Sequence, residues 1–73
     1  MRGWLIEIRE KKGFTQEQIA TRCGISRQYY GMIESGARNA SVVVAKRLGF
    51  VLNFDWQRFF DGEAIWKNKD TVN

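Results

Sequence analysis

The side chains that could carry out chemistry in this chain are suited to recognition through hydrogen bonds. The single cysteine, Cys23, has no histidine anywhere in the sequence to serve as its base or to share a zinc ion with it. We therefore expect no enzymatic activity, no bound metal and no cofactor. Arg27 and Gln28 are adjacent, and a guanidinium and an amide can each form two hydrogen bonds to one partner.

These two residues lie at the start of a helix that is predicted over about 26–35. A second helix is predicted directly before it, over 16–23, because Thr15 and Gln18 have the spacing of a capping box and Gly24 can end the helix. Two short helices joined by a tight turn with a glycine form a helix-turn-helix unit, in which the first helix braces the second.

The apolar spacing supports this pairing. The residues expected to point into the angle between the two helices are Ile19, Cys23, Ile25, Tyr30 and Ile33, with the small Ala20 where the helices approach each other. The outward face of the second helix then carries Arg27, Gln28, Gly31, Met32 and Ser35. Gly31 is unexpected there, because a glycine inside a helix costs roughly 0.5–1 kcal/mol relative to alanine.

Three further helices complete a predicted all-α domain over residues 1–60. The first spans 3–12, and the fourth begins after Ser41 with an inward stripe of Val42, Ala45, Leu48 and Leu52. Among the three consecutive valines, we expect Val43 to be exposed. A short fifth helix follows Asp55 and is expected to end near Phe60, leaving 61–73 as a mostly mobile tail in which Ile65 and Trp66 could bind a partner.

Aromatic residues gather in the fifth helix and just before it. We expect Phe54, Trp56, Phe59 and Phe60 to leave an apolar patch that a second copy of the chain covers. The alternative is a monomer in which all of these rings are internal.

The charge is unevenly distributed along the chain. The net charge is +4, and residues 1–47 hold nine Lys and Arg against four acids, whereas 48–73 hold three against four. A basic segment suggests a polyanionic partner, although a solvated surface explains this excess equally well. No apolar run approaches the roughly 20 residues of a membrane span, so we expect a cytoplasmic protein with no membrane partner.

The order of these features resembles a known family. Residues 5–41, LIEIREKKGFTQEQIATRCGISRQYYGMIESGARNAS, resemble the phage-repressor and Cro-like helix-turn-helix family, also called the xenobiotic-response-element class. The resemblance continues through VAKRLGFVLNFDWQRFF and covers about residues 4–60. It implies a compact five-helix bundle similar to the lambda repressor DNA-binding domain, which binds double-stranded operator DNA, commonly as a homodimer, with the second helix of the motif in the major groove.

The resemblance also implies roles for individual residues. It places Arg27, Gln28 and Met32 over base edges, where guanine, adenine and the thymine methyl group would be their respective partners. It places on the DNA backbone Gln16, Tyr29, Ser35, Arg38 and Asn39, and it pairs Arg9 with Glu34 in a salt bridge between the first and third helices. The chain departs from the family at Ala40, where a proline is common, and at Tyr30, where a smaller aliphatic residue is usual.

Simpler interpretations stay open for several of these residues. Arg27 and Gln28 could be solvated, Tyr29 could be partly buried, and Asn39 could cap its loop. Gly31 either brings the helix backbone close to DNA or relieves crowding beside Tyr30.

The expected function is that of a sequence-specific transcriptional regulator, and more narrowly of a repressor. The alternative is an antitoxin or anti-repressor that uses the same fold to hold a protein partner. Because about 13 residues follow the bundle, too few for a ligand-sensing domain, we expect control through concentration, proteolysis or a regulatory protein.

Overall fold

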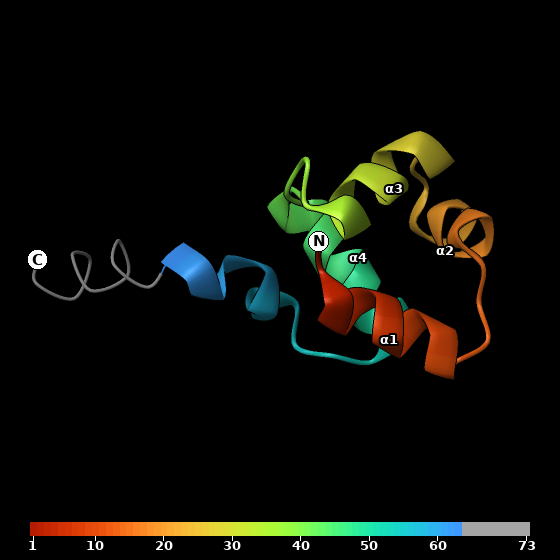
Figure 1. Ribbon diagram of the computed structural model, residues 1–73, viewed down its shortest axis with the longest axis horizontal. Coiled ribbons are helices and arrows are strands. Elements are labelled where there is room, and N and C mark those ends of the chain that lie inside the picture. Colours follow the sequence, from red (N-terminus) through yellow and green to blue (C-terminus); the bar gives the residue numbers. More distant parts are fainter. Residues whose placement is uncertain (64–73) are drawn as a thin grey trace, which may run out of the picture.

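The computed structural model describes residues 1–63, and within them the chain is helical with no strand. Four α-helices precede one 3-10 helix: α1 (Gly3–Lys11), α2 (Gln16–Cys23), α3 (Arg27–Ser35), α4 (Val42–Leu52) and η1 (Trp56–Glu63). The four α-helices surround a common core to which η1 adds Phe59, and the C-terminal end of η1 points away from the bundle (Figure 1). The predicted all-α bundle is confirmed.

Local capping signals set the starts of three helices. The side chains of Thr15, Ser26 and Ser41 each accept a hydrogen bond from the backbone N–H three residues later, which satisfies one of the unpaired donors at a helix start. Gln18 completes the capping box, because its Oε1 accepts from the Thr15 N–H at 2.9 Å. The predicted bounds of α2 and α3 are confirmed for this reason.

The fifth helix differs from its prediction in length. Asp55 does start it, and its Oδ1 accepts from the Gln57 N–H at 3.0 Å. The helix is of the 3-10 type and continues to Glu63, whereas we expected it to end near Phe60. The proposed boundary between a domain over 1–60 and a tail over 61–73 stays a prediction. The role suggested for Ile65 and Trp66 lies outside the described residues.

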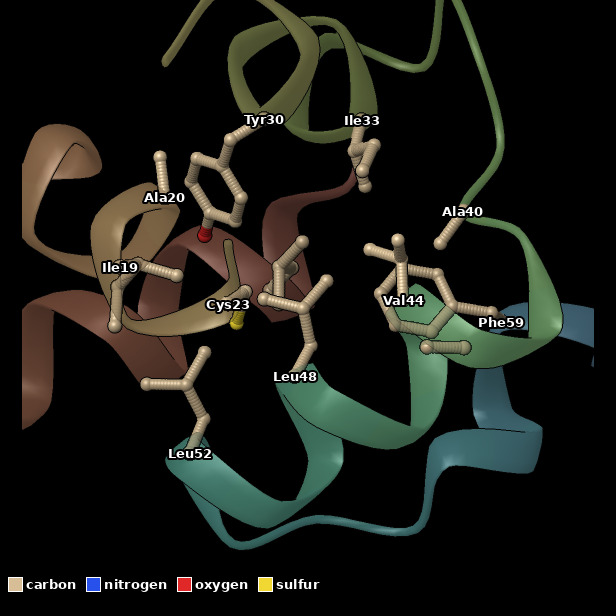
Figure 2. Packing of buried hydrophobic residues seen from close by; sticks show 12 residues of the cluster. Ile19, Ala20, Cys23, Tyr30, Ile33, Ala40, Val44, Leu48, Leu52 and Phe59 are labelled. Carbon is tan, nitrogen blue, oxygen red and sulfur yellow. The ribbon is translucent and has the colours of Figure 1, made fainter. Parts of the chain in front are cut away.

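The core lies between α4 and the helix-turn-helix pair (Figure 2). Leu48 and Leu52 of α4 are fully buried and face Ile19 and Cys23 of α2, while Tyr30 enters from α3. The expectation that Val42 belongs to the inward stripe of α4 is wrong, since Val42 is 49% exposed.

Val44 is the valine that faces inward. It packs beside Ala40 and Phe59 at the start of α4, whereas Val42 and Val43, at the first two positions of the helix, lie outside the core (Figure 2). The exposure expected for Val43 is confirmed at 57%.

The aromatic residues of the fifth helix pack mainly against the protein itself. The Trp4 ring lies 5.3 Å from Phe54 and 5.2 Å from Phe59, and Trp56 lies 6.0 Å from Phe60, measured between ring centroids. Phe59 is buried and the other three members of the expected patch are half-buried. The aromatic side chain that the described structure leaves exposed is Phe50, on α4. The expected apolar patch is thus largely internal, because Trp4 of α1 covers part of it.

None of the helices within residues 1–63 has the length and apolar character that crossing a membrane requires.

Gly49 allows the chain after α4 to fold back against it. A Cβ atom at this position would lie 2.7 Å from the Phe54 carbonyl oxygen and 3.2 Å from the Trp56 backbone nitrogen. At Gly31, in contrast, the nearest atom outside the adjacent residues and the helix backbone is Gln16 Oε1, at 3.9 Å.

Replacing each of these two glycines with alanine should therefore change stability in opposite directions. Gly49→Ala should lower the free energy of unfolding by roughly 1–3 kcal/mol, because backbone atoms must move to admit the methyl group. Gly31→Ala should raise it by roughly 0.5–1 kcal/mol, because alanine is the better helix former. Urea unfolding of both variants measures the two changes, and a Gly49→Ala protein as stable as the wild type would contradict the close approach.

Candidate nucleic-acid interface

The outward face of α3 is open along its length. Arg27, Gln28 and Ser35 are exposed, and Gly31 and Met32 are half-exposed between them. Neither Arg27 nor Gln28 forms a side-chain hydrogen bond or an ion pair with any residue in 1–63. The first turn of the helix thus presents two bidentate hydrogen-bonding groups whose polar atoms are available to a partner.

The opposite face of α3 is held by a buried carboxylate. Glu34 is 2% exposed, and its Oε2 accepts from Arg9 Nε at 2.6 Å and from the Tyr30 hydroxyl at 2.5 Å. Its Oε1 accepts from Gln16 Nε2 at 2.9 Å and from Arg9 Nη2 at 3.3 Å. Arg9 Nη1 donates to the Phe14 carbonyl at 2.8 Å. These contacts join α1, α2 and α3 at one point.

This network fixes the protonation states of its members. Burial raises the pKa of Glu34, but hydrogen bonds from Arg9, Tyr30 and Gln16 outweigh burial, and the net pKa lies below its usual value. Burial and the bond to Glu34 raise the pKa of the Tyr30 hydroxyl, so it remains a donor. The hydrogen bond that Arg9 donates to Glu34 raises the pKa of Arg9. The carboxylate is therefore ionised and neutralised by one guanidinium.

Tyr30 completes the network. Its ring is fully buried and directed from α3 into the core (Figure 2). Its hydroxyl, which a smaller aliphatic residue would lack, donates to Glu34, one turn further along the same helix. Successive helical residues point in different directions, so the ring does not occupy the outward space beside Gly31.

Gln16, at the first position of α2, is half-buried. Its amide nitrogen is engaged by Glu34, and its amide oxygen faces Gly31. The sequence pattern gave no indication of this bond to Glu34. It makes Gln16 a link between the buried carboxylate and the outer surface.

Several expected backbone-contacting residues are also engaged internally. The Tyr29 hydroxyl donates to the Asn39 carbonyl at 3.4 Å and accepts from the Ser41 N–H at 3.3 Å. Asn39 Nδ2 donates to the Phe59 carbonyl at 3.3 Å. Ser35 Oγ donates to the Met32 carbonyl at 3.1 Å. These bonds favour partial burial for Tyr29 and a loop-fixing role for Asn39, the simpler alternatives, and contact of either residue with a phosphate stays a prediction.

Arg38 keeps its charge available on the surface. It is exposed, its guanidinium lies 5.5 Å from the Tyr29 ring centroid, and it forms no ion pair within 1–63. Together with Arg27 it gives the α3 face a positive charge at each end.

Arg2 is a residue that the sequence analysis missed. Its guanidinium donates to the Ile33 carbonyl at 2.5 Å, the Arg38 carbonyl at 3.1 Å and Asn39 Oδ1 at 2.6 Å. No motif marks Arg2, because all of its acceptors lie more than 30 residues away in the sequence.

Comparison with known proteins finds similarity to helix-turn-helix proteins in both sequence and structure. Residues 5–57 match a family model described as helix-turn-helix. An uncharacterized HTH-type transcriptional regulator of Bacillus subtilis, YqaF, is 52% identical, with 99% of each chain covered. An uncharacterized HTH-type transcriptional regulator of Archaeoglobus fulgidus is 34% identical over 90% of this chain and 97% of its own. The crystal structure of the restriction-modification controller protein C.AhdI from Aeromonas hydrophila has a TM-score of 0.67 and 36% identity, covering 75% of this chain and 80% of that one.

The Tyr30 hydroxyl should stabilise the fold in a pH-dependent way. The folded pKa of Glu34 is lowered, so its stabilisation is complete above the unfolded pKa of about 4.3 and is lost as the pH falls through the folded value. Tyr30→Phe removes one donor to the carboxylate and should cost roughly 1.5–3 kcal/mol near neutral pH. That cost should shrink as the pH falls through the folded pKa of Glu34, which lies below the unfolded value, because the carboxylate then becomes protonated.

Tyr29→Phe is the matched control, because it deletes a neighbouring hydroxyl whose long bonds go to uncharged backbone groups. Its effect on the free energy of unfolding should be smaller and independent of pH. Urea unfolding from about pH 7 to about pH 2 measures both variants. A Tyr30→Phe cost that stays constant to the lowest pH would refute stabilisation of the ionised carboxylate.

Proposed function

Because the chain belongs to the helix-turn-helix family and is a DNA-binding transcriptional regulator, we propose that it acts as a repressor by inserting α3 into the major groove of an operator. Occupying an operator excludes other proteins from the same stretch of DNA, which makes repression the simplest consequence. The observation that supports the proposal most directly is the contrast between the two faces of α3. One face is fixed by the buried Glu34, and the other presents unpartnered Arg27 and Gln28.

Base reading is assigned to the first two turns of α3. Gln28 can donate to and accept from the N7 and N6 edge of adenine, and Arg27 can donate twice to guanine. Met32, one turn later and half-exposed, is suited to packing against a thymine methyl group. All three lie on a helix whose N-terminus is capped by Ser26, so their backbone is ordered before DNA arrives.

Gly31 lies between these residues on the same face. A Cβ at this position would meet Gln16 Oε1 at an ordinary contact distance of 3.9 Å, so packing against α2 does not require a glycine here, and we assign it to close approach of the α3 backbone to DNA. Gly31→Ala should then weaken operator binding although it stabilises the free protein.

Backbone contacts are assigned to the residues around α3. Gln16 begins α2, where the partial positive charge of the helix start favours a phosphate, and one amide hydrogen remains after the bond to Glu34. Arg38 supplies a full charge on the other side of α3. Tyr29, Ser35 and Asn39 would act mainly by holding the loop that carries Arg38, and we assign them secondary contacts with the DNA backbone.

We further propose that the protein binds as a homodimer in the cytoplasm, where its DNA lies. Met1, Val42, Val43 and Phe50 are the exposed large apolar side chains of the described residues, and Phe50 is 89% exposed. A symmetric dimer would read a pseudo-palindrome with half-site centres about 10 base pairs apart. Site selection from random DNA tests this, since unpaired half-sites would indicate a monomer. A regulatory protein partner would act by competing for one of these surfaces, which is also how an antitoxin or anti-repressor would use the fold.

DNA binding should weaken steeply as salt rises, because Lys and Arg displace condensed counterions from phosphates. Fluorescence anisotropy between about 50 and 200 mM salt measures the slope. A flat log–log plot would count against DNA binding and in favour of a protein-interaction module.

Gln28→Ala should lower affinity for the selected operator by roughly 1–3 kcal/mol and leave binding to unrelated DNA nearly unchanged, because the amide reads a base. Gln16→Ala is the internal contrast, and it should weaken all sequences about equally. Since Gln16 also bonds Glu34, thermal melting must first establish that both variants are folded. If Gln28→Ala retained the full wild-type preference at every operator position, α3 would not read DNA through this residue.

A further inference from the structure

The C-terminal end of α3 is capped by a residue from the opposite end of the chain. The helix ends at Ser35, and the left-handed Gly36, with φ of 88°, turns the chain away. The last carbonyls of a helix lack partners within the helix. Here the Ile33 carbonyl accepts from Arg2 Nη1 at 2.5 Å, and the Glu34 carbonyl accepts from the Arg2 backbone N–H at 2.7 Å.

Arg2 also supplies a charge that α3 lacks. The last turn of α3 contains no basic residue, and the end of a helix carries a partial negative charge. The chain that leads into α1 passes against this end (Figure 1). A Cβ atom on Gly36 would lie 3.2 Å from the Met1 backbone nitrogen, which shows how closely the two segments pack.

The same guanidinium fixes the loop that follows α3. Arg2 Nη1 donates to the Arg38 carbonyl at 3.1 Å, and Nη2 donates to Asn39 Oδ1 at 2.6 Å. Asn39 in turn donates to the Phe59 carbonyl, and the Arg2 guanidinium lies 5.5 Å from the centroid of the Phe59 ring. One planar group therefore connects the end of α3, the loop and η1.

We propose that Arg2 is a positioning residue for DNA binding, which holds Arg38 and the loop of residues 36–40 in a fixed relation to α3. The inference rests on the proposed function, since it names a residue that sets the geometry of that interface. A loop ordered before binding does not lose its conformational freedom in the complex, so affinity is gained without an additional contact.

A direct phosphate contact is the competing role for Arg2. Arg2 is half-buried as a residue, and three of its guanidinium N–H groups are directed at protein acceptors. A residue that neutralises a phosphate contributes about one unit to the slope of log affinity against log salt, whereas a positioning residue leaves that slope unchanged.

Arg2→Ala and Arg2→Lys test the proposal, with Arg58→Ala as the matched control. Arg58 is exposed and its guanidinium lies 4.4 Å from the Trp4 ring centroid, but its side chain forms no hydrogen bond to α3 or to the loop. Each alanine variant loses one positive charge and one cation–π contact. Operator affinity is measured against salt at a temperature where melting shows every variant to be folded.

We expect Arg2→Ala to bind the operator about tenfold more weakly than Arg58→Ala, with the same salt slope. Arg2→Lys should recover only part of the loss, because an ammonium group cannot reproduce the planar fork. Equal affinities for the two alanine variants would overturn the proposal. A slope reduced by about one unit only in Arg2→Ala would also overturn it and would make Arg2 a phosphate ligand.

A second measurement does not depend on DNA. The Arg38 N–H donates to the Met32 carbonyl at 3.2 Å, so its hydrogen exchange reports whether the loop is closed on α3. The amide hydrogen of Arg38 should exchange faster in Arg2→Ala than in Arg58→Ala. Equal exchange rates in the two variants would show that Arg2 does not hold the loop. If the wild type bound no DNA selectively, the proposed function would fail, and the exchange rates alone would decide whether Arg2 fixes the loop.

Discussion

The buried carboxylate of Glu34 is the constraint on which the arrangement of the first three helices depends. An ionised group that is 2% exposed is costly unless it is paired and fully hydrogen-bonded. Glu34 receives donors from α1, α2 and its own helix, so these elements must meet at its two oxygens. No side-chain polar atom buried within the described residues is left without a partner. Such a site sets orientation more than net stability, because the gain from pairing mainly offsets the cost of desolvation.

Because the bonds to Glu34 hold only the inward face of α3, its outward face remains exposed to solvent. The helix is anchored inwardly by Tyr30, Ile33 and Glu34, and its two ends are fixed independently, by Ser26 at the start and by Arg2 beyond the last turn. Arg27 and Gln28 are therefore presented on a rigid element without having internal partners of their own. Rigidity of this kind reduces the entropy lost on binding, and it suits a surface whose task is to match a stiff partner.

Several features of the fold could be predicted because their causes are local in the sequence. The starts of α2, α3 and α4 follow from oxygen-bearing side chains that bond an N–H three residues later, and the ends of α2 and α3 follow from glycines in the left-handed conformation. The spacing of apolar residues correctly assigned Ile19, Cys23, Tyr30 and Ile33 to the core. The remaining positions of α3 then had to form its outward face. The pairing of Arg9 with Glu34 came from resemblance to a family, and not from any local pattern.

The sequence by itself thus determined the helical elements, the helix-turn-helix and the residues on its free face, because capping and periodicity act over three or four positions. Only the tertiary structure decided which valine of α4 enters the core, that Trp4 packs against Phe54 and Phe59 while Phe50 stays exposed, and that Gln16 bonds Glu34. It also decided that Arg2 caps α3. These outcomes depend on how close separate elements come in space, and side chains that meet across 18 to 55 positions of sequence leave no periodic signal by which they could be recognised.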